Sequence, residues 1–375
     1  MISPEKNFNL ELSPYLSFCV QSRNDNHGGN MYRRMRTCLM GFFEQAERHQ
    51  LRSEIVLVDW NPPANKPILK DAYQWPRHSQ FCTIRVIVVP PSIHQRYPDW
   101  QRIPVNNCVA QNVAVRRARG KFILPSTVDV LFSDHLMQFL ASGELQEDKI
   151  YQIDRTDVNR KVTRLHSLDE QLDYCAKNVL RIHRFQSQNP HRLVDGILES
   201  WNPLPGLEEF PAFYTAGPGD FTLMARNRWH ELHGFPETDL LGGGMDILLA
   251  YMACVSGAKA ESLADKGSLY HIDHNLRFHS PEANWLARFG LRDILPKAVL
   301  DNLRSVVRRF FPARTELEKV GIQTMTWAEM ADLISQMARK ERSVAYNGEN
   351  WGLGNETFEE FVVTAAEMNE AVANV

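Results

Sequence analysis

The segment Lys121-Phe-Ile-Leu-Pro-Ser-Thr-Val-Asp-Val-Leu-Phe-Ser-Asp134 decides the fold. A basic amphipathic stretch, residues 112–119, runs into Gly120, and an apolar strand then delivers Asp129 at its far end. Ligands of open α/β sheets bind at the carboxyl ends of the parallel strands. A carboxylate at that position suits a hard divalent cation. The segment therefore predicts a buried parallel strand with a cation site at its carboxyl end.

The composition describes a globular protein with ample core material. The chain has 375 residues, of which 43% are hydrophobic and 23% charged, enough for one large domain or two ordinary ones. Its formal net charge of -3 argues against a nucleic-acid partner, because such binders are usually basic. Six cysteines without a C-x-x-C pair argue against a zinc ribbon or a disulfide framework.

The sequence also predicts the location of the protein. No apolar run reaches the roughly 18 to 20 residues that a membrane span needs, and residues 1–13 lack the apolar core of a signal peptide. We therefore expect a cytoplasmic protein without a membrane span. Peripheral association with a membrane, or with an assembly that builds surface polysaccharide, stays open.

The first half of the chain alternates strand and helix. Strands are expected at 15–21, 54–58, 83–89, 122–124 and 151–157, and helices at 31–49 and 105–119. Strands separated by helices favour a parallel sheet with helices on both faces.

The second half has a less regular pattern. Short strands at 221–225 and 268–271 accompany helices at 226–233 and 247–256, with loops at 202–206 and 242–244. Beyond residue 280 we expect helices at 282–311 and 327–341, a loop at 347–352 and a final helix from residue 357. The chain is thus divided into a main domain, 1–280, and a helical C-terminal extension, 281–375.

Several motifs together resemble glycosyltransferases of the GT-A fold, close to family 2 and its relatives, over roughly residues 15–275. The end of the first strand, Ser22-Arg-Asn-Asp25, matches the family's approach to the nucleotide base, and Asp59 matches an aspartate that contacts base or ribose. Asn112-Val-Ala-Val-Arg-Arg-Ala-Arg-Gly120 matches the helix before the metal strand. The resemblance implies a Rossmann-like α/β fold, a mixed sheet flanked by helices. Residues 15–135 would be its nucleotide-binding half and 136–280 its acceptor-side half.

The resemblance also implies a set of nucleotide contacts. Thr127 stands where the family commonly has the first aspartate of Asp-x-Asp; it can hydrogen-bond a ribose or phosphate but supplies no charge, so either metal binding is weaker or the metal is dispensable. Arg116 offers a planar fork that fits phosphate, although most helical arginines face solvent. The nucleotide-binding residues expected on this basis are Ser22, Arg23, Asn24, Asp25, Asp59, Arg116 and Thr127.

The expected cofactor is a divalent cation, Mn²⁺ or Mg²⁺. Asp129 aligns with the second carboxylate of the family motif, usually a direct metal ligand. A histidine after the last strand completes the metal shell in many GT-A enzymes, and here the candidates are His271 and His274. Strand alternation favours His271. The alternative is that Asp129 only caps a turn.

On the acceptor side, Asp246 is the expected catalytic base of an inverting enzyme, because it heads an apolar helix after a glycine-rich loop. The alternative is a helix cap that interacts with the helix dipole. Asp220 and Glu237 are expected to contact acceptor or sugar. Trp351 could stack on a sugar face, although tryptophan is more often a core residue.

The resemblance implies transfer of a sugar from a UDP- or GDP-sugar to a saccharide or another hydroxyl acceptor, with inversion and metal assistance. Two alternatives stay open: a retaining transferase of the same fold, and a non-catalytic protein that binds sugar nucleotides or acts as a scaffold. The second is suggested by the missing first carboxylate. P-loop, dinucleotide-binding and nucleophile-elbow motifs are absent from the sequence.

Overall fold

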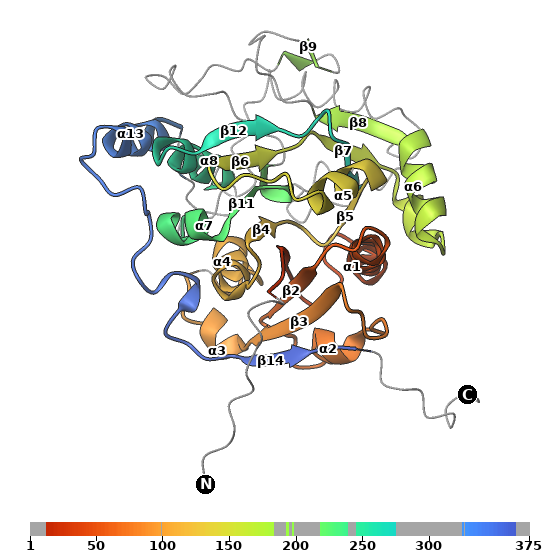
Figure 1. Ribbon diagram of the computed structural model, residues 1–375. Helices are drawn as coiled ribbons and strands as arrows, with labels where there is room; N and C mark the ends of the chain where they lie inside the picture. Colours follow the sequence, from red (N-terminus) through yellow and green to blue (C-terminus); the bar gives the residue numbers. More distant parts are fainter. Residues whose placement is uncertain are drawn as a thin grey trace.

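The computed structural model describes residues 13–98, 100–183, 218–238, 245–274, 325 and 327–364, and the backbone of 193–194 and 197–198. These residues form an α/β fold around an eight-stranded mixed sheet of order β12-β6-β11-β4-β1-β2-β3-β14, flanked by helices (Figure 1). The predicted fold class is therefore confirmed.

Parallel strands form the centre of the large sheet: β1 (Leu16–Ser22), β2 (Ser53–Trp60), β3 (Cys82–Val89) and β4 (Phe122–Pro125). Strands β1 and β2 are buried almost throughout, as expected when helices cover both faces of a parallel sheet. The register pairs Ser22 with Asp59 and Cys19 with Pro125. The carboxyl ends of β1, β2 and β4 therefore meet at one edge of the sheet.

The outer strands make the sheet mixed. β11 runs antiparallel to both β4 and β6, β12 runs parallel to β6, and β14 runs antiparallel to β3. Their bounds are β6 (Lys149–Gln152), β11 (Leu223–Ala225), β12 (Lys259–Ser262) and β14 (Glu359–Val362).

Helices cover both faces of this sheet (Figure 1). On one face Phe42 stacks on Phe18 of β1 at a ring distance of 4.5 Å, because α1 presents an apolar stripe to the sheet. On the other face the side chain of Asn106 caps the start of α4 by accepting a hydrogen bond from the Val109 amide. The first face carries α1 (Met31–Arg48) and α5 (Asp134–Ala141), and the second carries α4 (Asn107–Arg117), α7 (Arg226–Leu232), α8 (Met245–Val255) and α13 (Trp327–Ala338).

A second sheet of order β5-β13-β7-β8 lies beside the first. The single strand expected at 151–157 is wrong: the chain leaves the large sheet after Gln152 and joins the small one at Arg155, so it forms β6 and β7. Both pieces have strand-like local sequence, and only pairing with distant strands separates them. The bounds are β5 (Val130–Phe132), β7 (Arg155–Val158), β8 (Val179–His183) and β13 (Leu269–Ile272).

The C-terminal region differs from its expectation. Helix α13 and the loop at 347–352 are present, but the helix predicted from residue 357 is wrong, because 359–362 form β14. The buried guanidinium of Arg85 on β3 pairs with Glu54 at 2.6 Å and with Glu360 at 2.8 Å, which fixes β14 to the sheet. The end of the predicted helical extension is thus part of the main sheet. The helix expected at 282–311 and the loops at 202–206 and 242–244 lie outside the described residues.

Short elements complete the described chain. They are α2 (Leu69–Ala72), α3 (Pro91–His94), η2 (Arg160–Arg164), α6 (Leu168–Lys177), β9 (Leu193–Val194), β10 (Ile197–Leu198), η3 (Pro218–Asp220) and η4 (Trp351–Leu353).

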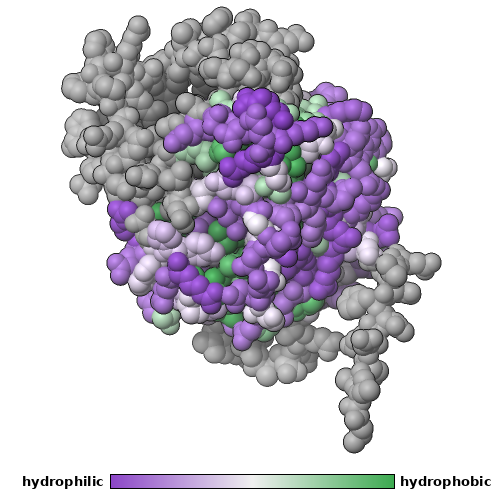
Figure 2. Space-filling model, turned by 90° about the vertical axis from the view of Figure 1, so that its left-hand side faces the viewer, coloured by the Kyte–Doolittle hydropathy of each residue, from purple (hydrophilic) through white to green (hydrophobic). Residues whose placement is uncertain are grey.

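The face that carries α13 and α7 is mostly hydrophilic, with apolar residues visible in small hollows (Figure 2). No helix in the described part of the chain is both long and apolar enough to cross a bilayer.

Candidate functional site

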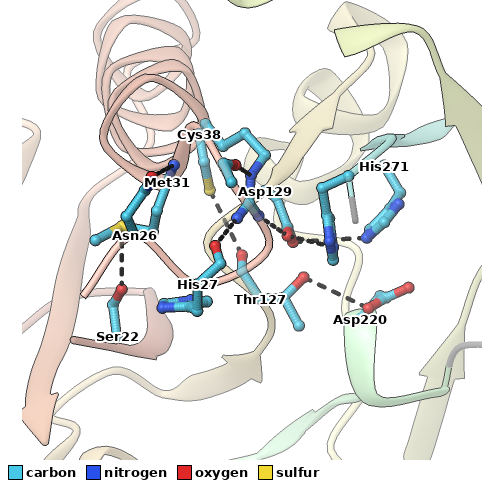
Figure 3. A network of polar contacts seen from close by, with 12 residues as sticks. Ser22, Asn26, His27, Met31, Cys38, Thr127, Asp129, Asp220 and His271 are labelled. Atoms are coloured by element: carbon cyan, nitrogen blue, oxygen red, sulfur yellow. Dashed lines mark hydrogen bonds and ion pairs between the residues drawn. The ribbon is translucent and has the colours of Figure 1, made fainter. Parts of the chain in front are cut away.

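The three predicted metal ligands, Asp129, His271 and His274, lie together, and we call them the cation cluster. Asp129 is 5% exposed and lies in the turn between β4 and β5. The distance from Nε2 of His274 to Oδ2 of Asp129 is 3.0 Å, and that from Nε2 of His271 to Oδ1 is 3.7 Å. One ligand atom from each residue lies within 4.8 Å of the other two. Figure 3 shows Asp129 and His271 facing each other.

The small sheet positions this cluster. β5 begins directly after Asp129 and pairs with β13, with His271 opposite Val130. Alternation alone would place His274 on the other face from His271, but β13 ends at Ile272, so strand alternation no longer applies at His274. The two imidazole rings consequently lie 5.2 Å apart.

The cluster fits a divalent cation. Oδ1 of Asp129 is buried and has no hydrogen-bond partner among the described residues. Burial acts to raise the pKa of Asp129, but His271, His274 and Arg34 outweigh it and hold that pKa well below its usual range. The carboxyl group is therefore ionised, as a ligand must be. One carboxylate oxygen and two imidazole nitrogens form a donor set that suits a divalent transition-metal ion.

Sequence reasoning missed Arg34, which contacts this cluster from α1. The side chain is 1% exposed, and its Nη1 donates to Oδ2 of Asp129 at 2.5 Å. Its Nε and Nη2 donate to the backbone carbonyls of Gly29, at 3.1 Å, and His27, at 2.5 Å. Arg34, Cys38, Gly41 and Gln45 form one buried stripe of α1, with spacing i, i+4, i+7 and i+11. A charged residue on a buried stripe is the signal that could have identified it.

A row of ion pairs extends from the cluster towards the acceptor side. Nδ1 of His271 is 3.3 Å from Oδ1 of Asp157, another residue that the sequence analysis missed. Arg155 bridges that carboxylate, through Nε at 2.7 Å, and the carboxylate of Asp220, through Nη1 at 3.0 Å. Thr127 lies beside Asp220, and its hydroxyl donates to Oδ1 at 3.4 Å (Figure 3). The cluster and Asp220 are thus connected by two charged side chains, Asp157 and Arg155.

Asp246, the expected base, lies at the start of α8 next to Asp220. Its Oδ2 accepts a hydrogen bond from the Gly219 amide at 2.9 Å, and its Oδ1 accepts one from the Ile247 amide at 3.0 Å. Burial raises its pKa, and the charge of Asp220 adds to that effect. A raised pKa suits a proton acceptor. The two backbone hydrogen bonds are also what a structural carboxylate would form.

The residues expected to hold the nucleoside surround the ends of β1 and β2. Asp59 is fully buried, its Oδ2 accepts a hydrogen bond from the Leu69 amide at 2.7 Å, and its Oδ1 has no partner in the described part of the chain. Burial raises the pKa of Asp59 to about 6. Arg23 lies close enough to counteract this rise. Ser22 lies opposite Asp59 in the sheet register.

The loop after β1 is held by its own side chains. Nη1 of Arg23 pairs with Asp25 at 2.9 Å, and its Nε donates to the carbonyl of Asn61 at 2.6 Å. The side-chain amide of Asn24 donates to the carbonyl of Pro67 at 3.0 Å. The structure therefore brings the predicted 22–25 turn to the same sheet edge as Asp59.

Three predicted site residues, Arg116, Glu237 and Trp351, belong to a hydrogen-bond network separate from the cation cluster. Nη1 of Arg116 donates to the carbonyls of Glu349, at 3.0 Å, and Trp351, at 2.9 Å, instead of pointing freely to a phosphate. Oε1 of Glu237 accepts hydrogen bonds from Nδ2 of Asn112, at 2.8 Å, and from the Gly352 amide, at 2.7 Å.

Trp351 corrects a further expectation. It is 3% exposed and packs between the guanidinium of Arg116 and the ring of His233, so it offers no free face to a sugar. The expected sugar stacking is therefore not supported. We call this network the C-terminal clamp, formed by Asn112, Arg116, Glu237, Asn347 and Trp351.

Comparison with known proteins gives limited similarity. No known family and no curated protein matches the chain. Among solved structures, S. aureus TarS 1-349 is similar at 15% identity with a TM-score of 0.40, over 68% of this chain and 60% of that one. The same protein in complex with UDP-GlcNAc is 15% identical with a TM-score of 0.41, over 69% of this chain and 58% of that one. The catalytic domain of Drosophila beta1,4galactosyltransferase 7, in complex with xylobiose, is 10% identical with a TM-score of 0.34, over 71% of this chain and 73% of that one.

The chain spans about three fifths of the TarS structures.

Proposed function

We propose that the chain is a glycosyltransferase that moves a sugar from a nucleoside-diphosphate sugar to a hydroxyl acceptor, with inversion and the assistance of a divalent cation. One observation carries the proposal: the cation cluster at the end of β4 and the unpaired Oδ1 of buried Asp59 at the end of β2 share one sheet edge. Only β1 lies between these strands, so two strand spacings, about 10 Å, separate them. This separation suits a nucleoside at one point and its diphosphate at the other.

On the donor side, Asp59 is the acceptor for the nucleoside. A buried polar atom without a partner costs about 1–3 kcal/mol, and an N–H of the base or a hydroxyl of the ribose removes that cost by donating to Oδ1. A UDP- or GDP-sugar supplies both kinds of donor. Ser22 and Arg23 flank this position.

A cation held by Asp129, His271 and His274 would offset the negative charge that the diphosphate gains as it departs. Within the chain, the Asp157 carboxylate lies 3.3 Å from Nδ1 of His271, which forms no hydrogen bond within the described residues, so Asp157 acts on that imidazole through its charge, from the position that carboxylates commonly take behind metal-binding histidines.

On the acceptor side, Asp246 takes the proton of the attacking hydroxyl. The hydroxyl attacks the anomeric carbon opposite to the departing diphosphate, which inverts the configuration. The two backbone hydrogen bonds of Asp246 favour a second candidate, a retaining transferase in which Asp246 holds the turn at 218–220. The anomeric configuration of the product, read by NMR, separates the two.

A thermal-shift screen of UDP- and GDP-sugars, with and without Mn²⁺, tests the proposal. A donor that binds the folded state raises Tm by mass action. We expect Asp59→Asn to reduce the shift under both conditions and Asp129→Ala to remove only its metal-dependent part. Asp265→Asn is the matched control, because that carboxylate is exposed. If no nucleotide-sugar moves Tm, the proposal is wrong.

We infer further that the enzyme works in the cytoplasm, that its acceptor is a saccharide, and that it takes part in polysaccharide biosynthesis.

A further inference from the structure

Arg34 contacts the same carboxylate that the cation needs. Its guanidinium has three acceptors, namely Oδ2 of Asp129 and the carbonyls of His27 and Gly29. Arg34 is 1% exposed and contacts all three acceptors from α1. The carboxylate of Asp129 is therefore neutralised from within the chain.

The charge of the site follows from this pair. Asp129 contributes one negative charge and Arg34 one positive charge, and the imidazoles of His271 and His274 are neutral when they act as ligands. A divalent ion would enter a cluster with no net charge and would be repelled by the guanidinium. This repulsion is stronger in a buried site than in water, because the dielectric constant is lower there.

The same guanidinium holds the loop between β1 and α1. Asn26, Gly28, Gly29 and Asn30 all have positive φ, between 53° and 74°. Glycine and asparagine tolerate this left-handed region better than other residues. The loop directly follows the 22–25 turn expected to hold the nucleoside, and Arg34 fixes it through the carbonyls of His27 and Gly29.

We propose that Arg34 is a positioning residue that competes with the divalent cation for Asp129, and that it couples cation binding to the conformation of loop 25–30. Without the ion, Arg34 neutralises Asp129 and holds loop 25–30 in the conformation of this structure. When the ion binds, the guanidinium leaves Oδ2, and its hydrogen bonds to the loop carbonyls are lost with it. The choice of ion rests on the proposed function.

Two consequences follow from the competition. The affinity for the ion is lower than the ligand set alone would provide. Thr127, which replaces a carboxylate, acts in the same direction, and both features weaken metal binding. The coupling is also reciprocal, because any loop conformation that the nucleotide favours must change ion affinity by the same factor by which the ion changes nucleotide affinity.

Calorimetric titration of Mn²⁺ into the nucleotide-free full chain tests the competition. We expect Arg34→Met to bind Mn²⁺ at least ten times more tightly than the unmodified protein, and Arg34→Lys, which keeps the charge, to lie between the two. Arg36→Met is the matched control, since that arginine is exposed on the same helix, and it should leave the affinity unchanged. Equal or weaker binding by Arg34→Met would overturn the proposal.

Hydrogen exchange on the unmodified protein tests the coupling without a destabilising substitution. The amides of His27, Gly29 and Met31 are hydrogen-bonded within the loop, to Asp25 or Asn26. Saturating Mn²⁺ should accelerate their exchange and leave the amides of β2 unchanged. Unchanged exchange across 25–31 under saturating Mn²⁺ would overturn the coupling.

The outcomes separate this inference from the proposed function. Similar Mn²⁺ affinities of the unmodified protein and Arg34→Met refute the competition and leave the transferase proposal standing. Absence of nucleotide-sugar binding refutes the transferase and leaves the titration result standing. Absence of Mn²⁺ binding in every variant refutes the competition and the metal assignment together.

Discussion

Two polar networks in this chain, the C-terminal clamp and the region of the cation cluster, differ in how completely their side chains are hydrogen-bonded. In the C-terminal clamp, Oδ1 of Asn112 accepts from the Phe235 amide at 2.7 Å, and its Nδ2 donates to Glu237 and to the Phe235 carbonyl, both at 2.8 Å. In the region of the cation cluster, Oδ1 of Asp129 and Oδ1 of Asp59 are buried and have no hydrogen-bond partner within the described ranges.

The difference indicates what each network is for. A buried network with every atom paired stabilises one conformation. A buried carboxylate with one oxygen unpaired costs stability, and such atoms need an explanation such as an absent ion or ligand. The clamp thus holds α4 to the loops at 234–237 and 347–352, while the unpaired oxygens of Asp129 and Asp59 agree with the proposed binding of a cation and a nucleoside.

The largest effect is expected at Asp246. Asp246→Asn keeps the shape of the side chain and removes the proton acceptor, so turnover of the bound donor should fall by about 10² to 10⁴. Donor binding should stay within about twofold, as measured by thermal shift. A loss below tenfold would assign Asp246 to the support of the 218–220 turn.

The free energy of unfolding should depend on pH through the titration of Asp59. Its pKa is about 6 in the folded protein and 3.8 ordinarily, so the folded state retains the proton longer than the unfolded state does. Stability from this group is therefore lost as pH rises from about 4 to about 6, by about 3 kcal/mol. Urea unfolding of the unmodified protein and Asp59→Asn across this range isolates the effect, because the variant lacks that slope. Parallel pH profiles would contradict the prediction.

The residue behind His271 should have a smaller effect on the cluster. Asp157→Asn removes the charge that orients the imidazole, and changes of this kind typically reduce metal affinity by about 10- to 100-fold. Calorimetry with Mn²⁺ measures the change, with Asp265→Asn as the control. Unchanged affinity would limit Asp157 to holding Arg155.

Much of the fold was predictable from local pattern. Strands β1 to β4 and helix α1 lie within a few residues of their expected positions, because apolar runs are separated by residues such as Pro90 and Gly120 that break regular structure. β14 was not predictable, because Glu360 is drawn to the sheet by Arg85, 275 positions away in the chain. Local sequence does not contain a contact of that range.

The same distinction applies to the site. The convergence of Asp129, His271 and His274 was predictable, because Asp129 follows one apolar strand and the two histidines stand at the end of another, where side chains of α/β sheets gather. Arg34 was harder to identify: its place on the buried stripe of α1 is a signal, but its partner is 95 positions away and an arginine in an amphipathic helix normally faces solvent. Trp351 was assigned wrongly because an aromatic residue in a polar loop has the same local sequence context whether it faces solvent or packs against α4.

The clamp should show the smallest effect and the clearest contrast with the cluster. Glu237→Gln keeps an oxygen that can accept from Nδ2 of Asn112 and from the Gly352 amide. Burial already raises the pKa of Glu237, so loss of its charge should cost no more than about 1 kcal/mol of stability. Its Mn²⁺ affinity should equal that of the unmodified protein, because the clamp and the cluster share no residue. A change in Mn²⁺ affinity above about threefold would show that the two networks are coupled, and the division into a structural and a ligand-binding network would then be wrong.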